Sequence, residues 1–117
     1  MTVPALITAL SPLFTGGAWP LRADQGTPMP YLTLQRAGGQ PVNTFCGVPG
    51  KENGRFQFNV WAKTQIEADA LMAQVKAVVC DQATFRGVAL SEREWVEGYD
   101  TRTFGARQDF SIWWATT

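Results

Sequence analysis

The chain has 117 residues, which predicts a single domain spanning residues 1–117 and long enough to bury a core of its own. Its ten basic and ten acidic residues cancel, which argues against a protein that holds nucleic acid by its phosphates. The chain has no histidine and so lacks the commonest general base and the commonest metal ligand.

The cysteines and the apolar stretches predict a soluble, intracellular protein. Cys46 and Cys80 do not make a disulfide framework, and we expect Cys80 to be a small core residue at the end of a helix. No basic region precedes the apolar run at the N-terminus, so we expect no signal peptide. No stretch approaches the length of a membrane span, so we expect no membrane association.

Residues 2–14 are predicted to form a short amphipathic helix. Pro12 comes late in this segment and is expected to loosen the last turn, and Gly16 and Gly17 then end the helix. The apolar residues that recur at helical spacing are Val3, Leu6, Ile7, Leu10, Leu13 and Phe14.

Two extended segments follow, separated by a loop. Residues 18–22 predict a short strand. Pro20 favours a place at the edge of a sheet, because proline cannot donate a hydrogen bond to a ladder. Residues 24–30 hold a glycine and two prolines and predict a loop. Residues 31–37 predict a second strand, with its two leucines on one face.

The least regular stretch is residues 38–53, which holds four glycines and two prolines. A loop of this length in a compact domain is usually functional or disordered, so a contact with another chain and a plain hairpin connection both stay open. As a contact, the loop is expected to be mobile in an isolated subunit and ordered against a neighbour. The candidate contact residues are Gly38, Gly39, Gln40, Val42 and Phe45.

The most regular pattern lies in residues 54–80. Its first part alternates apolar and polar side chains, which is typical of a half-buried strand. At Thr64 the period becomes helical, and Thr64 with Glu67 forms a capping box at the start of a long helix. We expect Leu71 and Val75 of this helix to face the sheet. The strand and the helix then cover each other and define the core.

The last third of the chain is predicted to hold two more strands. After a turn at residues 81–87, residues 88–98 form a strand with imperfect alternation, and residues 99–106 form a hairpin connection. Residues 107–116 form the final strand. The order of elements predicts an α+β fold: an antiparallel sheet of about four to five strands, with the N-terminal helix and the one long helix packed on one face.

The sequence contains none of the common catalytic patterns. It has no glycine-rich phosphate loop and no nucleophile elbow, and two distant cysteines cannot supply a zinc site. We therefore expect no enzyme, no metal and no cofactor. Arginines interrupt the one cluster of carboxylates, and a solvated strand face explains this cluster as well as a metal or acid–base site does. Its members are Glu92, Glu94, Glu97 and Asp100.

The five tryptophans are the most unusual feature of the composition. Trp61 and Trp113 both fall on the polar side of their predicted strands. They either pack on each other or under a loop of the same chain, or mark a sheet face that meets another protein chain. An aromatic pocket for a small ligand around Trp19, Trp61, Trp95 or Trp113 is a further possibility.

Several segments in order suggest a family. Trp-Pro-Leu-Arg-Ala-Asp-Gln-Gly at 19–26 and Pro-Tyr-Leu-Thr-Leu-Gln-Arg at 30–36 follow the first helix. Gln-Pro-Val-Asn at 40–43 and Arg-Phe-Gln-Phe-Asn-Val-Trp-Ala at 55–62 come next, and Asp-Phe-Ser-Ile-Trp at 109–113 closes the set. Over residues 6–114 the chain resembles the tail completion proteins of long-tailed bacteriophages, also called tail terminator or tail-to-head joining proteins.

The resemblance implies a structural role in the virion. It implies a ring, commonly of six subunits, that caps the finished tail tube, stops its polymerisation and offers a surface to the head connector, while DNA passes through the lumen without being read. The implied partners are further copies of the chain, the tube protein and the head–tail connector or stopper protein. The implied location is the tail or neck of the virion, after assembly in the cytoplasm of the bacterial host.

Two alternatives stay open at this point. One alternative to the ring-forming protein is another neck or baseplate component, such as a head–tail stopper. The other is a small-ligand module with an aromatic pocket. For a ring-forming protein, the expected interface residues are Trp61 and Trp113, together with the five residues of the 38–53 loop named above.

Overall fold

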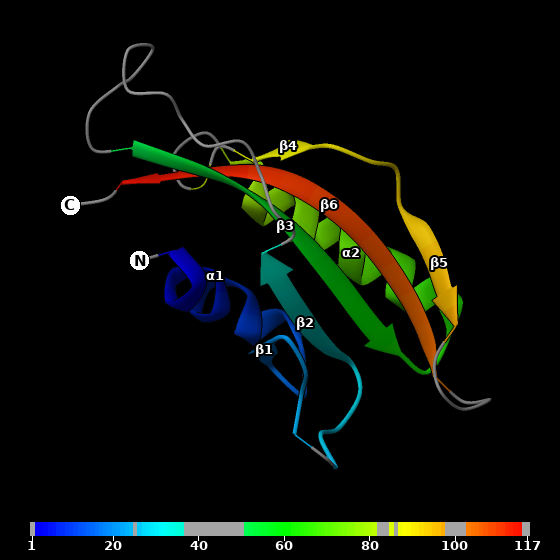
Figure 1. Ribbon diagram of the computed structural model, residues 1–117. Helices are drawn as coiled ribbons and strands as arrows, with labels where there is room; N and C mark the ends of the chain where they lie inside the picture. Colours follow the sequence, from blue (N-terminus) through cyan, green and yellow to red (C-terminus); the bar gives the residue numbers. More distant parts are fainter. Residues whose placement is uncertain are drawn as a thin grey trace.

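The computed structural model describes residues 2–24, 26–36, 51–81, 85, 87–97 and 103–115. In these ranges a six-stranded sheet is covered on one face by helices (Figure 1). In chain order the elements are α1 (Thr2–Leu10), a 3-10 turn η1 (Ser11–Leu13), β1 (Ala18–Pro20), β2 (Tyr31–Arg36), β3 (Lys51–Ala62), α2 (Gln65–Val79), β4 (Val88–Ala89), β5 (Glu94–Glu97) and β6 (Phe104–Ala115).

The sheet is built around β3 and β6, which pair antiparallel along all 12 residues of each strand. The strand order is β1-β2-β3-β6-β4, and β5 also pairs with β6. The predicted α+β fold is confirmed, with one strand more than the upper expected number. One pairing differs from the prediction, because β1 runs parallel to β2 after residues 21–30 carry the chain back along the sheet. Pro20 lies on the edge strand, as predicted.

The first α-helix is shorter than the predicted segment 2–14, although Pro12 alters its last turn as expected. The α-helix stops at Leu10, and Pro12 lies in the 3-10 turn that follows. Proline lacks the N–H that an α-helical turn would use, so the tighter turn replaces the last part of the helix. The turn leaves Phe14 buried at the rim of the core.

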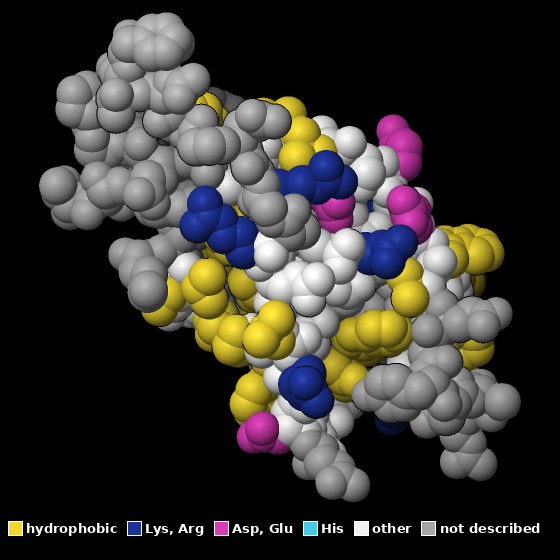
Figure 2. Space-filling view, in the orientation of Figure 1, with side chains coloured by type: hydrophobic (Ala, Val, Ile, Leu, Met, Phe, Trp, Pro, Cys, Tyr) yellow, Lys and Arg dark blue, Asp and Glu magenta, His cyan; other side chains and the backbone are white. Residues whose placement is uncertain are grey.

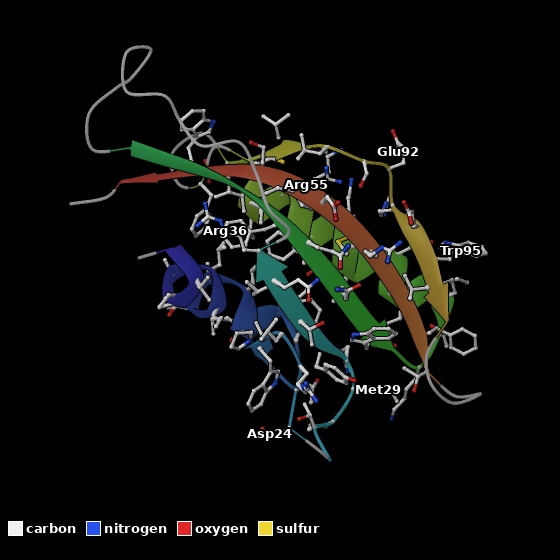
Figure 3. The ribbon with its side chains drawn as sticks, in the orientation of Figure 1. Asp24, Met29, Arg36, Arg55, Glu92 and Trp95 are labelled. Atoms are coloured by element: carbon white, nitrogen blue, oxygen red, sulfur yellow. The ribbon has the colours of Figure 1, made fainter. Side chains whose placement is uncertain are left out.

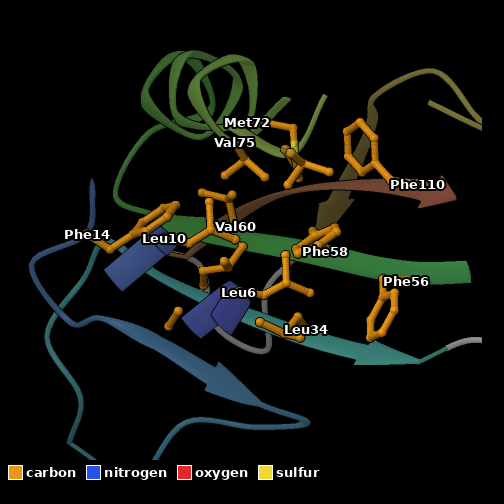
Figure 4. Close-up of a cluster of buried hydrophobic side chains, with 14 of the residues drawn as sticks. Leu6, Leu10, Phe14, Leu34, Phe56, Phe58, Val60, Met72, Val75 and Phe110 are labelled. Carbon is orange, nitrogen blue, oxygen red and sulfur yellow. The ribbon is translucent and has the colours of Figure 1, made fainter. Parts of the chain in front are cut away.

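Both helices bury their apolar sides against the same face of the sheet (Figure 4). Phe58 and Phe110 meet edge to face with ring centroids 5.6 Å apart, a favourable arrangement for two aromatic rings. The core includes Leu6, Leu10 and Phe14 from the N-terminal segment, Leu32 and Leu34 from β2, Phe56, Phe58 and Val60 from β3, Ala68, Met72, Val75 and Val79 from α2, and Ala106, Phe110 and Ile112 from β6.

The start of α2 matches the predicted cap, because the Thr64 hydroxyl accepts a hydrogen bond from the backbone N–H of Glu67 at 3.1 Å. The prediction for the buried side of the helix is right for Val75. It is right only in part for Leu71, which is partly buried beside the core, whereas Met72 is completely buried. Successive helical residues point about 100° apart, so the stripe through Met72 leaves Leu71 at its flank.

Two predicted loop boundaries are wrong. The stretch 38–53 was expected to lack regular structure up to Asn53, but β3 already begins at Lys51, because residues 51–53 pair with residues 113–115 at the end of β6. The connection expected over residues 99–106 ends earlier, since β6 begins at Phe104. Glycine at 105 suggested a turn, yet Gly105 lies within the strand opposite Trp61.

The predicted strand 88–98 is two short strands, β4 and β5. Between the Ala89–Phe110 pair and the Glu94–Arg107 pair, this side of the ladder contains four residues and β6 contains two. The surplus residues interrupt the strand, which explains the imperfect alternation of the sequence. Ser91 bridges the interruption: its hydroxyl accepts from the N–H of Asp109 at 3.1 Å and its carbonyl accepts from the Gln108 side chain at 2.9 Å.

Candidate protein–protein interface

The face of the sheet opposite the helices is open in the described part of the chain. Alternation brings every second residue of β2, β3 and β6 to this face. Figure 2 shows mostly white atoms across its middle, which are uncharged polar side chains and backbone. Its charged groups form local pairs. Arg55 donates two hydrogen bonds to Oδ2 of Asp109, and Arg107 reaches Oε2 of Glu94 at 2.8 Å. Locally neutralised charge suits a surface that meets another protein better than one that grips a polyanion.

Trp61 is packed against its own chain. A Cβ atom placed on Gly105 would lie 2.8 Å from Cζ3 of Trp61, so the indole covers this glycine closely. The indole N–H also points to the Thr33 hydroxyl, at 3.4 Å. An aromatic side chain over a strand glycine fills the place of its missing side chain. A contact of Trp61 with a neighbouring subunit stays a prediction.

Trp113 is 39% exposed and lies far from Trp61. The ladder places it opposite Asn53, eight residues along β3 from Trp61, or about 27 Å at ~3.4 Å per residue. The idea that the two tryptophans pack on each other is therefore wrong. The other predicted contact residues, Gly38, Gly39, Gln40, Val42 and Phe45, lie outside the described residues.

Trp113 belongs to a two-stranded extension of the sheet, which we call the arm and which consists of residues 51–54 and 112–115. β2 pairs with β3 only as far as Phe56, and β4 pairs with β6 only as far as Ser111. Beyond these points β3 and β6 continue as a pair, drawn at the upper left of Figure 1. Among the described residues, the arm has one further backbone bond, from the N–H of Trp113 to the carbonyl of Phe85 at 3.2 Å.

A second apolar surface lies at the other end of β6. It consists of Ile66, Trp95 and Phe104, which are 84%, 72% and 39% exposed, and we call it the Trp95 patch. Trp95 pairs with Ala106 and Glu97 pairs with Phe104, so Trp95 and Phe104 are diagonal neighbours on one face of the β5–β6 ladder.

Hydrogen bonds tie the Trp95 patch to α2. The indole N–H of Trp95 donates to Oδ2 of Asp69 at 3.1 Å, and Arg93 donates to the Asp69 carbonyl at 2.8 Å. Ile66 lies three residues before Asp69, and residues at this spacing share one side of a helix. Figure 3 shows Trp95 at the outer edge of β5. Sequence reasoning included Trp95 only as a possible pocket residue, because nothing in the local pattern indicates which helix β5 meets.

Comparison with known proteins identifies the class of molecule that carries these two surfaces. Residues 4–115 match the family model described as tail completion protein gp17. The chain belongs to this family of phage tail completion proteins. The resemblance inferred from the sequence is confirmed, and with it a structural role in the virion and a place in its tail or neck.

The comparison with solved structures gives a distant likeness. This tail completion protein is similar to the bacteriophage SPP1 gp17 protein, with 18% identity and a TM-score of 0.45. The alignment covers 81% of this chain and 72% of the SPP1 protein. A search of curated proteins found no match.

The tryptophans of this tail completion protein do not gather around one pocket. Trp19 lies on β1 at one edge of the sheet, and Trp95 lies on β5 beyond the opposite long strand. Four strand spacings of about 4.8 Å separate these two strands, or roughly 19 Å. The aromatic side chains therefore mark separate surfaces. No helix in the described ranges combines the length and the apolar character needed to cross a membrane.

The described members of the carboxylate cluster lie in the outer strand β5 or just before it. Glu92 and Glu94 are exposed, and Glu94 pairs with Arg107. The Glu97 side chain and Asp100 lie outside the described residues. Within the ranges that the structure describes, no three acidic or cysteine side chains come together as a metal site would require. The exposed, paired state of Glu94 fits a solvated strand edge.

Cys80 caps the C-terminal end of α2 and is partly buried. Burial raises the pKa of the Cys80 thiol, and the positive charge of Lys76 acts in the opposite direction. A thiol with a raised pKa is mostly protonated and therefore a poor nucleophile. The other cysteine, Cys46, lies outside the described residues.

Proposed function

We propose that this tail completion protein forms a ring that caps the finished tail tube, stops the addition of tube subunits and joins the tail to the head connector. Membership of the tail completion family supports the tail role. The ring is commonly six-membered in proteins of the kind that the sequence resembles, and we propose the same number here. Its partners are then copies of itself, the tube protein and the connector or stopper protein, and its lumen passes DNA.

The observation that carries the self-association is the arm. A two-stranded ribbon is marginally stable alone in water. The arm also presents Trp113, which is 39% exposed. Tryptophan is enriched among the residues that dominate binding energy at interfaces. Contact with a neighbouring subunit would cover the indole and stabilise the ribbon.

The remaining parts of the proposal follow from the tail role. Assembly takes place in the cytoplasm of the bacterial host, and the finished ring becomes part of the virion neck. Gly38, Gly39, Gln40, Val42 and Phe45 precede the arm in the chain, and their contribution to the ring stays a prediction. The family match favours tail completion over a head–tail stopper or a baseplate protein, and the dispersed tryptophans give no support to a ligand-binding module.

The test compares Trp113→Ser with the unmodified chain by sedimentation velocity and electron microscopy, alone and with tail tubes. We expect the unmodified chain to form rings that cap tubes. We expect Trp113→Ser to remain folded, with unchanged circular dichroism, but to stay monomeric at the same concentration. Leu21→Asn is the matched control, because Leu21 is 70% exposed away from the arm and has a φ of 64°, which asparagine tolerates.

If Trp113→Ser forms normal rings, the arm is not part of the interface between subunits. An unmodified chain that neither self-associates nor binds tube ends would refute the proposed function itself.

A further inference from the structure

The β3 side of the arm, residues 51–54, reads Lys-Glu-Asn-Gly. All four residue types are depleted in β-strands, because they gain little from packing on a pleated surface. This side of the arm has no apolar side chain, whereas the β6 side contains Ile112, which is completely buried. Residues 51–54 are therefore held by the ladder with β6, and they can leave it without uncovering an apolar side chain of their own.

The same residues contain Asn53–Gly54, the dipeptide in which asparagine deamidates most readily. In this reaction the backbone nitrogen of the glycine attacks the side-chain carbonyl carbon of the asparagine. The new C–N bond closes a succinimide ring, the C–N bond of the amide breaks, and ammonia leaves. Water then opens the ring to aspartate or isoaspartate. Glycine favours the attack because it has no side chain to hinder the ring and its backbone turns freely.

The paired arm blocks this reaction. The N–H of Trp113 points away from β3, to the carbonyl of Phe85. Hydrogen-bonded and non-hydrogen-bonded pairs alternate along an antiparallel ladder. The Trp113–Asn53 pair is therefore non-hydrogen-bonded, and the next pair, Ile112–Gly54, is hydrogen-bonded. The ladder thus holds the attacking nitrogen of Gly54, and the extended backbone of a strand keeps it away from the carbonyl carbon that it must reach.

Opening of the arm removes both restraints. Proteins open locally at their least stable elements without unfolding as a whole, and a two-stranded ribbon is such an element. We infer that Asn53 is a site of spontaneous deamidation that the pairing of the arm controls, and that the modified subunit is impaired in assembly. The effect on assembly rests on the proposed ring, whereas the reaction itself belongs to the single chain.

The product alters the surface that carries Trp113. Aspartate and isoaspartate both replace a neutral amide with a carboxylate, at the residue that pairs directly with Trp113. A charge that an interface removes from water without a partner weakens binding. Isoaspartate also adds one backbone atom, which disturbs the register of the arm. Unassembled subunits therefore lose competence with time, whereas a neighbour that covers the arm in a ring keeps it paired and intact.

The reaction is measured by incubating the chain at pH 8 and digesting samples with trypsin. Cleavage after Lys51 and Arg55 releases residues 52–55, whose mass shows the change from amide to acid. An isoaspartate methyltransferase labels the isoaspartate product. We expect the dilute native chain to deamidate at Asn53, at least about tenfold more slowly than the chain unfolded in urea.

Met72→Ala separates opening of the arm from unfolding of the whole domain. Loss of this buried side chain should raise the unfolded population about thirtyfold or more. The deamidation rate should stay within about twofold of the parent rate, because only the arm has to open. Asn59 is the internal control: it lies in the same strand before Val60, whose branched side chain hinders ring closure, and it should not react.

Three results would overturn the deamidation site. They are equal rates in native and unfolded chain, no reaction at Asn53 in the native chain, and a native rate that rises with Met72→Ala as far as the unfolded population does.

The effect on assembly is tested by sedimentation of Asn53→Asp and its matched control, Asn53→Gln. Asn53→Asp should raise the concentration for half-association by about tenfold. Asn53→Gln keeps a neutral amide and should assemble normally. Equal association of the two variants would overturn the inferred effect on assembly while the ring stands. A parent chain that never self-associates would refute the proposed ring, and the measurements on the dilute chain would still decide the deamidation site.

Discussion

Alanine substitutions along α2 test where the helix meets the core. Met72 is completely buried, Leu71 is partly buried, and Ile66 is 84% exposed on the same helix. Met72→Ala removes a side chain that packs among core residues of the sheet (Figure 4) and leaves a cavity, so we expect a loss of about 2–5 kcal/mol in the free energy of unfolding. Leu71→Ala should cost about 1 kcal/mol, and Ile66→Ala less than about 0.5 kcal/mol.

The assay is urea unfolding followed by circular dichroism, at a concentration low enough to keep the chain monomeric. Alanine is the best helix former, so helix propensity does not explain a loss at any of the three positions. The slope of the unfolding free energy against urea concentration should be the same for each variant. An unchanged slope shows that each variant exposes the same surface on unfolding. In a thermal scan, a loss of about 2 kcal/mol should lower the Tm by roughly 8 °C for a domain of this size.

The order of the three losses is the sharp part of this prediction. If Leu71→Ala costs as much as Met72→Ala or more, the buried side of the helix is turned by one residue, about 100°, from that in the structure. A large loss for Ile66→Ala would mean that this residue is covered in the monomer, which contradicts its exposure and its place in the Trp95 patch.

Two further predictions concern single contacts. Gly105→Ala should destabilise the monomer by about 1–3 kcal/mol, because its Cβ would lie 2.8 Å from Trp61. In a Trp61→Ser background this cost should shrink, and strictly additive losses would show that the two residues do not touch. Burial raises the pKa of Cys80, so stability from its neutral thiol is present below the pKa of the unfolded chain and is lost as pH rises above it. In a Cys46→Ser background, iodoacetamide at pH 8 should modify native chain more slowly than urea-unfolded chain, and equal rates would contradict the raised pKa.

Local features of the fold were predictable from the sequence because each depends on neighbours only a few residues away. The alternation from Phe56 to Ala62 predicts the buried face of β3, and the Thr64 hydroxyl caps α2 as its spacing to Glu67 predicts. Pro12 and Pro20 act through their missing N–H groups and predict the tighter turn and the edge strand. The ordered segments also predicted the family.

The tertiary structure decided the features that depend on register between distant segments. Gly105 suggests a turn by itself, and only the antiparallel ladder with β3 places it under Trp61, 44 residues earlier in the chain. The parallel pairing of β1 depends in the same way on where the chain returns. The interface surfaces follow from these registers: β3 and β6 extend beyond their neighbours to form the arm, and β5 reaches α2 and leaves Trp95 exposed. The alternation of apolar and polar side chains shows which face of a strand is buried. It carries no information on which strand or helix lies alongside.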